Sequence, residues 1–254
     1  MNTRFHVPTK VFGSRRGRGG SADGDPGNPS ANAVPATLTG SDPILIDPML
    51  NENPGQSSSY LVPGTRVTLI DPGSANAAPK VLEALKSRRI KVDLILLTHI
   101  HPDAAAGAGV IARSFPKAEI AAPAGATACL ADPVALVSDM KKVYGEKVES
   151  IYGLPAPIDS VRINGLDDGD RIDLGDRVIE VISTPGHTTN HLSFFDSSNS
   201  SLFCGDSLGV QLPGSRVVRP STPPWDFSME DSLASIGKLS EVHADTVYLA
   251  HFGA

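Results

Sequence analysis

The stretch Thr98-His99-Ile100-His101-Pro102-Asp103-Ala104 decides what fold this chain is predicted to have. It follows the mostly apolar run Val92-Asp93-Leu94-Ile95-Leu96-Leu97, which predicts a strand buried on both faces. Two histidines and an aspartate therefore stand in a loop at the C-terminal end of a strand, where α/β sheets usually hold their functional residues. Imidazole and carboxylate are ligands that zinc and similar divalent metals accept. Taken alone, the stretch is equally compatible with a polar turn that carries two surface histidines.

Three further segments supply the same types of ligand, each at the end of a predicted strand. They are Thr184-Pro185-Gly186-His187, Cys204-Gly205-Asp206 and Ala250-His251-Phe252-Gly253. Because several strand ends carry such residues, we expect their side chains to meet in one metal centre.

Together the four segments resemble the signature of the metallo-β-lactamase superfamily, an HxHxDH motif followed by a His, a bridging Asp and a final His. The resemblance covers the chain from about Ser41 to its end and divides it into a tail (1–40) and a metallo-β-lactamase-like domain (41–254). It implies a mixed α/β (α+β) fold, the four-layer αββα sandwich. Family members generally continue into at least one more helix, so we expect this form to lack the last C-terminal helix.

The resemblance also implies the metal ligands. One metal would take the three nitrogens of His99, His101 and His187, and the second would take Asp103, a third motif histidine and His251, with Asp206 bridging the two. The chain departs from the motif at Ala104, which stands where the third histidine belongs. We therefore expect one tight zinc site and a second site that is weak or absent, with iron and manganese as alternative metals.

Two residues are expected to support the ligands from behind. An aspartate at the position of Asp71 supports the metal loop in the family, and His191 is interpreted as structural support for the site. Residues 208–227, which are irregular, proline-rich and contain Trp225, leave directly from Asp206 and are expected to border the active site.

The implied function is a metal-dependent hydrolase that uses a metal-bound hydroxide on an ester, lactone, thioester or related small molecule. Asp103 and Asp206 are the expected catalytic residues: both orient the nucleophile, and Asp103 shuttles its proton. Glyoxalase II resembles the motif set, but its thioester-binding C-terminal region has no counterpart in this sequence. Acyl-homoserine lactonases carry a tyrosine shortly after the bridging Asp, whereas Ser207-Leu208-Gly209 follows it in this chain.

Two alternatives stay open. The chain also resembles persulfide dioxygenases, whose single iron is held by two His and one Asp, a set that His99, His187 and Asp206 could supply. A metal-impaired, non-catalytic member of the fold is the other alternative, which Ala104 and the short C-terminus favour.

Composition limits the setting in which the protein works. A net charge of −6 and a pI near 5.6 argue against nucleic acid as a partner, and no apolar run approaches a membrane span. Two cysteines are too few for a disulfide framework, which favours a reducing cytoplasm. The tail is rich in Gly, Pro, Asn and Ser and predicts disorder, and the sequence does not indicate an oligomeric state.

Overall fold

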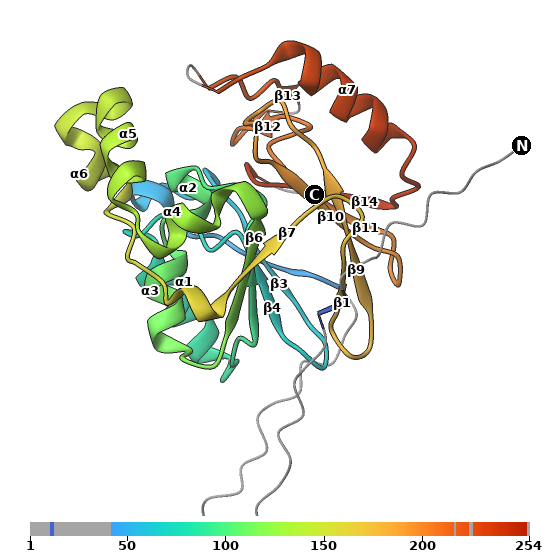
Figure 1. Cartoon of the computed structure of the whole chain (residues 1–254), viewed down its shortest axis with the longest axis horizontal. Coiled ribbons are helices and arrows are strands. Elements are labelled where there is room, and N and C mark those ends of the chain that lie inside the picture. The colour runs from blue at the N-terminus through green and yellow to red at the C-terminus, as the bar shows by residue number, and fades with distance from the viewer. Residues whose placement is uncertain (1–10, 13–41, 216, 224–225, 253–254) are drawn as a thin grey trace, which may run out of the picture.

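Two six-stranded sheets form the centre of the molecule (Figure 1). The computed structural model describes residues 11–12, 42–215, 217–223 and 226–252. In the first sheet the strand order is β2 (Ile44–Ile46), β3 (Ser59–Val62), β4 (Thr68–Ile70), β5 (Leu94–Leu96), β6 (Glu119–Pro123) and β7 (Ile163–Leu166). Strands β2, β3 and β4 pair antiparallel, and β4 through β7 pair parallel.

The second sheet is mainly antiparallel. Its order is β1 (Val11–Phe12), β8 (Arg171–Asp173), β9 (Val178–Ser183), β10 (Leu192–Asp196), β11 (Ser201–Gly205) and β14 (Thr246–Leu249). The two edge strands, β1 and β14, pair parallel with their neighbours, and the other described strands of this sheet pair antiparallel. A separate ribbon consists of β12 (Val210–Gln211) and β13 (Val218–Arg219).

Helices cover the outer faces of both sheets (Figure 1). The first sheet is covered by α1 (Ala78–Ser87), α2 (Pro102–Ala105), α3 (Ala108–Ser114), α4 (Thr127–Ala131), α5 (Val134–Tyr144) and α6 (Val148–Tyr152), and the second by α7 (Met229–Ser240). Short 3-10 turns lie at Leu50–Glu52, Ala124–Ala126, Gly145–Lys147 and Ser160–Arg162. The four layers, helix on sheet on sheet on helix, are those expected for the αββα sandwich.

Three apolar cores hold the layers together. The core between the sheets includes Tyr60, Leu96, Phe194 and Phe203, all fully or almost fully buried. A second core joins α1 and α3 to the outer face of the first sheet, and a smaller one joins α7 to the second sheet through Leu239. Because the two-sheet centre is packed from both sides, the loops at the strand ends begin from fixed positions.

The structure corrects two expectations about the local structure. The spacing of residues predicts one helix over residues 104–115, but it divides into α2 and α3 because Gly107 packs against the backbone carbonyls of residues 72–74. A Cβ at Gly107 would lie 2.8 Å from the Gly73 carbonyl oxygen. The segment 207–227, expected to be irregular, contains the β12–β13 ribbon.

Part of the predicted tail is described. Val11 and Phe12 pair with Arg171 and Ile172 at the edge of the second sheet. The rest of residues 1–40 and the side chain of Trp225 lie outside the described residues, so the predicted disorder of the tail stays a prediction. None of the described helices is both long enough and apolar enough to cross a bilayer.

Candidate metal centre

The predicted ligands follow strands of both sheets and lie close together. Strand β5 ends two residues before Thr98, and His101 is the N-cap of α2, so Asp103 lies in the first turn of that helix. Strands β9, β11 and β14 of the second sheet lead into His187, Asp206 and His251. Strands β5 and β11 are buried along their whole length, so they place the residues that follow them with little freedom.

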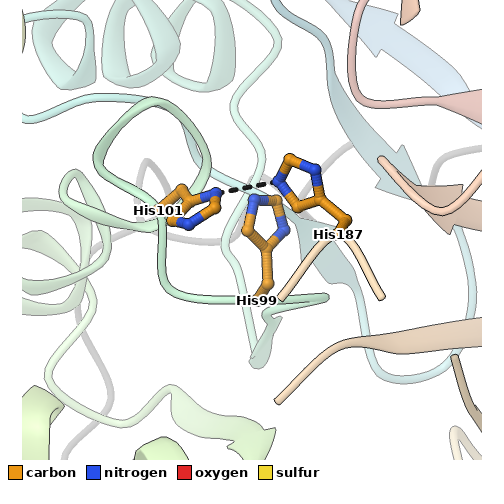
Figure 2. Close-up of side chains that lie close together, drawn as sticks. All are labelled: His99, His101 and His187. Atoms are coloured by element: carbon orange, nitrogen blue, oxygen red, sulfur yellow. Dashed lines mark hydrogen bonds between the residues drawn. The ribbon is translucent and has the colours of Figure 1, made fainter. Parts of the chain in front are cut away.

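The first group of ligands is His99, His101, His187 and Asp206. One ligand nitrogen from each of the three histidines lies within 4.8 Å of the others, and Figure 2 shows their rings converging. His101 Nδ1 lies 2.8 Å from His187 Nε2. Asp206 Oδ2 lies 3.2 Å from His187 Nε2 and 3.6 Å from His99 Nε2. The structure therefore brings together four of the predicted ligands.

The electrostatics of this group suit a cation. Burial, helped by the neighbouring imidazoles, lowers the pKa of His99 well below its ordinary value and that of His101 to about 4. Both rings are therefore neutral at pH 7 and keep a lone pair. Burial also raises the pKa of the Asp206 carboxyl, so its ionised form needs positive charge nearby.

Two buried atoms of the group lack a hydrogen-bond partner. Among the described residues, His99 Nε2 and Asp206 Oδ1 are both buried without one. Leaving buried polar atoms unpaired is costly, and native proteins rarely do so without a ligand or water. The three imidazoles and the Asp206 carboxylate lie together, and such nitrogens and oxygens are the donors that a divalent metal binds, so the residues fit the metal that the family implies.

Asp71 and Thr98 fix the orientation of His99. Thr98 donates its backbone N–H to Asp71 Oδ1 at 2.9 Å and its hydroxyl to Asp71 Oδ2 at 2.8 Å. Because the Thr98 hydroxyl donates its hydrogen to Asp71, its oxygen accepts a hydrogen bond from His99 Nδ1, at 2.9 Å. The proton of His99 is thereby placed on Nδ1, and Nε2 is left free to bind metal. The predicted supporting role of Asp71 thus acts through Thr98, whose role no sequence pattern signals.

His191 holds the backbone of Asp206, and its ring stacks on that of His99 with the ring centroids 5.1 Å apart. Its Nδ1 donates to Thr184 Oγ1 at 2.9 Å, and its Nε2 accepts from the Asp206 backbone N–H at 3.2 Å. Both ring nitrogens are therefore used. Gly205 has a φ of +52°, and a Cβ there would lie 2.6 Å from His191 Nε2, so this contact requires glycine.

His187 is oriented by the loop that follows Asp206. Its Nδ1 donates to the Ser221 carbonyl at 3.2 Å, which leaves Nε2 facing His101 and Asp206. No sequence pattern could have indicated Ser221, because any residue offers a carbonyl.

The second group, Asp103 and His251, forms an ion pair. His251 Nε2 lies 3.2 Å from Asp103 Oδ2 and 3.8 Å from Asp206 Oδ1, and Nδ1 donates to the Gln56 carbonyl. Burial opposes the charge on His251, but the two carboxylates outweigh it and raise the pKa of His251 to about 10. Burial likewise opposes the charge on Asp103, and His251 lowers the pKa of its carboxyl to about 2. Ala104, the residue after Asp103, is buried and offers only a methyl group.

Two cavities flank the ligands. One, of about 390 Å³, is lined by His187 and Asp206 together with residues of the β12–β13 ribbon and of α7. The other, of about 440 Å³, is lined by His101, Thr188 and Asn190 together with residues of α5. Residues of the 208–227 segment thus border the ligands, as expected from its departure at Asp206.

Comparison with known proteins agrees with the fold. The family profile of the metallo-beta-lactamase superfamily matches residues 53–251, and the chain belongs to this family. A solved structure with the same architecture is the archaeal superfamily protein ST1585 from Sulfolobus tokodaii. It is 27% identical, with a TM-score of 0.69 over 84% of this chain and 79% of that one. A family protein from Thermus thermophilus, 24% identical with a TM-score of 0.62 over 78% and 69% of the two chains, shares the fold.

Curated relatives include enzymes named hydroxyacylglutathione hydrolase. The protein of this name from Aeromonas hydrophila is 30% identical over 82% of this chain and 65% of its own length. The one from Vibrio campbellii is 29% identical over 73% of this chain and 57% of its own length. The chain therefore spans roughly three fifths of the length of these relatives.

Proposed function

We propose that this protein is a metal-dependent hydrolase that cleaves an acyl ester or thioester of a small molecule. The observation that carries the proposal is the convergence of three imidazoles beside the Asp206 carboxylate, whose Oδ2 lies 3.2 Å from His187 Nε2 and 3.6 Å from His99 Nε2. Such a donor set holds a divalent metal, which when bound supplies an acidified water and polarises a carbonyl oxygen. His99, His101, His187 and Asp206 are the proposed ligands of the tight site.

Asp103 and Asp206 are the proposed catalytic residues. Asp206 lies between the two groups, within 3.2 Å of His187 and 3.8 Å of His251, so its carboxylate can orient the attacking water. Asp103, kept ionised by His251, can accept the proton of that water and return it to the leaving group. The reaction adds OH to the acyl carbon and H to the leaving oxygen or sulfur as the bond between them breaks, so one water gives one acid and one alcohol or thiol.

Two finer assignments follow from the same residues. Zinc is the proposed metal, since three nitrogens and one carboxylate are ligands it accepts in tetrahedral sites, and manganese is the alternative for the same hydrolytic role. Asp103 and His251 form the proposed second site, which lacks a ligand at Ala104 and is weak or empty. We also propose a cytoplasmic location, because Cys129 and Cys204 are free thiols, as is usual in a reducing compartment.

The curated relatives support a thioester or ester in place of other substrates. By their name they act on hydroxyacylglutathione, in which an acyl group is joined to sulfur. The chain spans roughly three fifths of their length, so the leaving group is left open in the proposal.

A second candidate is an iron oxygenase. Asp206 Oδ2 lies within 3.6 Å of one nitrogen of His99 and of His187, which places two imidazoles and one carboxylate around one point. Two histidines and one carboxylate are the ligand set of many non-haem iron oxygenases.

Metal analysis together with activity separates these candidates. The protein is purified without chelator, its metal content per chain is measured, and hydrolysis of acetylthiocholine and p-nitrophenyl acetate is followed in air and under nitrogen. The hydrolase proposal expects one tight zinc or manganese per chain and turnover that is the same without oxygen. Iron as the tight metal, together with thiol oxidation that stops under nitrogen, would favour the oxygenase. No bound metal after reconstitution would contradict both.

A further inference from the structure

The cavity beside His187 and Asp206 has a mainly apolar lining. It lies between α7 and the β12–β13 ribbon and measures about 390 Å³, within the range of small-molecule sites. Two proposed metal ligands form one end of it. The apolar part of the lining consists of Leu208, Val218, Phe227, Met229, Leu233 and Ile236.

Helix α7 presents an apolar stripe to this cavity. Met229, Leu233 and Ile236 follow one another at positions i, i+4 and i+7 and are 67%, 64% and 42% exposed. The helix is fixed to the sheet by its other face, where Ser235 and Leu239 are buried. An exposed stripe of large apolar side chains next to a catalytic site is typical of a surface that contacts a ligand.

Close backbone contacts fix the cavity walls to the ligand loops. Ser228 donates its N–H to the Gly186 carbonyl at 2.8 Å, and Ser235 donates its hydroxyl to the Pro185 carbonyl at 2.6 Å. On the other wall, a Cβ at Gly209 would lie 2.4 Å from the Arg219 carbonyl, so glycine lets the ribbon approach the turn after Asp206. The apolar stripe therefore has a fixed position relative to His187 and Asp206.

The second cavity has a different lining. Asp139, Lys142, Asn190 and Asp226 contribute charged or amide groups to it, whereas among the described residues the acidic and basic side chains that line the first cavity are Arg219 and two of the proposed ligands, His187 and Asp206. An apolar group leaves water more favourably in the first cavity, and a polar group keeps hydrogen-bond partners in the second.

We propose that the substrate is an acyl compound whose hydrocarbon chain occupies the α7 cavity, with its carbonyl at His187 and Asp206. This inference rests on the proposed hydrolase function and adds the class of acyl group. A saturated chain matches the cavity because it needs no hydrogen-bond partner, and the cavity is continuous with the ligands, so a bound chain places its carbonyl end at them.

The test measures kcat/KM of the zinc-loaded protein for p-nitrophenyl acetate, butyrate, hexanoate and octanoate, each divided by its uncatalysed rate. We expect kcat/KM to rise about fourfold per methylene, the effect of removing one CH₂ from water, until the cavity is full. From butyrate to octanoate the rise would be on the order of 100-fold. Leu233→Ser and Val218→Ser should each lower the octanoate-to-acetate ratio about tenfold, since each removes apolar contact equivalent to about two methylenes.

Val161→Ser is the matched control, because Val161 is 85% exposed and lines neither cavity. It should keep the octanoate-to-acetate ratio of the wild type. A second readout needs neither metal nor turnover: calorimetry should show that octanamide binds the metal-free protein more tightly than acetamide, and that Leu233→Ser removes this preference.

The ester series and the amide binding together distinguish a failure of the proposed hydrolase function from a failure of the acyl-chain inference. If no ester is hydrolysed, the proposed hydrolase function fails and the inference fails with it. If the esters are hydrolysed with equal kcat/KM at every chain length, and octanamide binds no better than acetamide, only the inference fails. A wild-type dimer that Leu233→Ser dissociates, together with such a flat series, would show that a second copy of the chain covers the stripe, and would also overturn the proposal.

Discussion

The two halves of the candidate site differ in how completely they are built. In the first half, His99, His101, His187 and Asp206 converge, and hydrogen bonds from Thr98, Ser221 and His191 fix three of them. In the second half, Asp103 and His251 pair with each other, and Ala104, the residue after Asp103, offers only a methyl group. Asp206 belongs to both halves, since its two oxygens face His187 and His251.

The contrast shows what an incomplete ligand set does to the residues that remain. Burial lowers the pKa of the His99 and His101 imidazoles, so neither ring carries a charge that could neutralise the Asp206 carboxylate, and His99 Nε2 is left buried without a hydrogen-bond partner among the described residues. In the second half, a carboxylate and an imidazole satisfy each other as an ion pair, and a metal must displace the proton of His251 in order to bind there. The first half is therefore expected to bind metal much more tightly than the second.

The largest expected effect comes from removing a ligand of the first half. His187→Ala should abolish tight metal binding and lower kcat/KM for a thioester more than about 100-fold, since the loss of residues that merely support ligands already costs about 10–100-fold. His243→Ala is the matched control, because His243 precedes β14 and lies at the opposite end of that strand from His251. Metal content by elemental analysis gives the result, and tight binding that survives His187→Ala would show that the first half is not the main site.

Thr98→Val tests the support of the first half without removing a ligand. Valine keeps the shape of threonine but removes the hydroxyl between Asp71 and His99, so His99 loses the group that fixes its proton on Nδ1. We expect zinc affinity to fall about 10–100-fold while the fold is kept. A zinc titration against a competing chelator measures this effect.

Thr127→Val is the control for that substitution. The Thr127 hydroxyl donates to the Ala124 carbonyl within its own turn, away from the ligands. If Thr98→Val binds zinc as tightly as Thr127→Val does, the orientation of His99 does not depend on the Asp71–Thr98 contact.

Ala104→His tests the second half by adding a ligand instead of removing one. The family places an imidazole at this position, and Asp103, Asp206 and His251 remain as partners, so a single side chain would complete the set. We expect affinity for a second zinc to rise about tenfold or more, and ester hydrolysis to rise with it.

Steric crowding could prevent the imidazole of Ala104→His from reaching the second half. Ala104, Ala105 and Ala106 are all buried, and an imidazole needs space that a methyl does not. Zinc titration of both variants, with circular dichroism to show that each is folded, decides the question. A folded Ala104→His that binds no additional zinc would show that the second half is not an intact site with one ligand missing.

The places of the candidate ligands in the fold could be predicted from the sequence because these residues follow strand ends. Apolar runs mark β5, β9 and β11, and the residues after each run must lie at an edge of a sheet, which predicted the positions of His99, His187 and Asp206. The four layers followed from the same motif set through the family resemblance.

The missed features depend on backbone contacts between distant segments. The carbonyl of Ser221 and the close packing of Gly107 carry no pattern in the sequence, since any residue has a carbonyl and isolated glycines have many roles. The β12–β13 ribbon pairs two residues with two, which is too short for an alternating pattern to develop. The contribution of α7 to the cavity was also missed, because the exposed stripe of the helix resembles an ordinary amphipathic face.

The smallest expected effect concerns the far edge of the second sheet. Deletion of residues 1–40 removes β1, which pairs with β8, whereas His251 follows β14 at the opposite edge. The described part of the tail contributes one two-residue pairing, and each hydrogen bond in it is worth about 0.5–1.5 kcal/mol. Ordering each residue costs about 1–2 kcal/mol, so the net contribution is close to zero.

We therefore expect Tm to change by less than about 4 °C, and both halves of the site to bind zinc as in the full chain. Calorimetric melting and zinc titration of the two forms measure this. A drop of many degrees would show that the tail packs on the domain, and a loss of zinc affinity in the second half alone would show that His251 depends on the whole sheet as well as on β14.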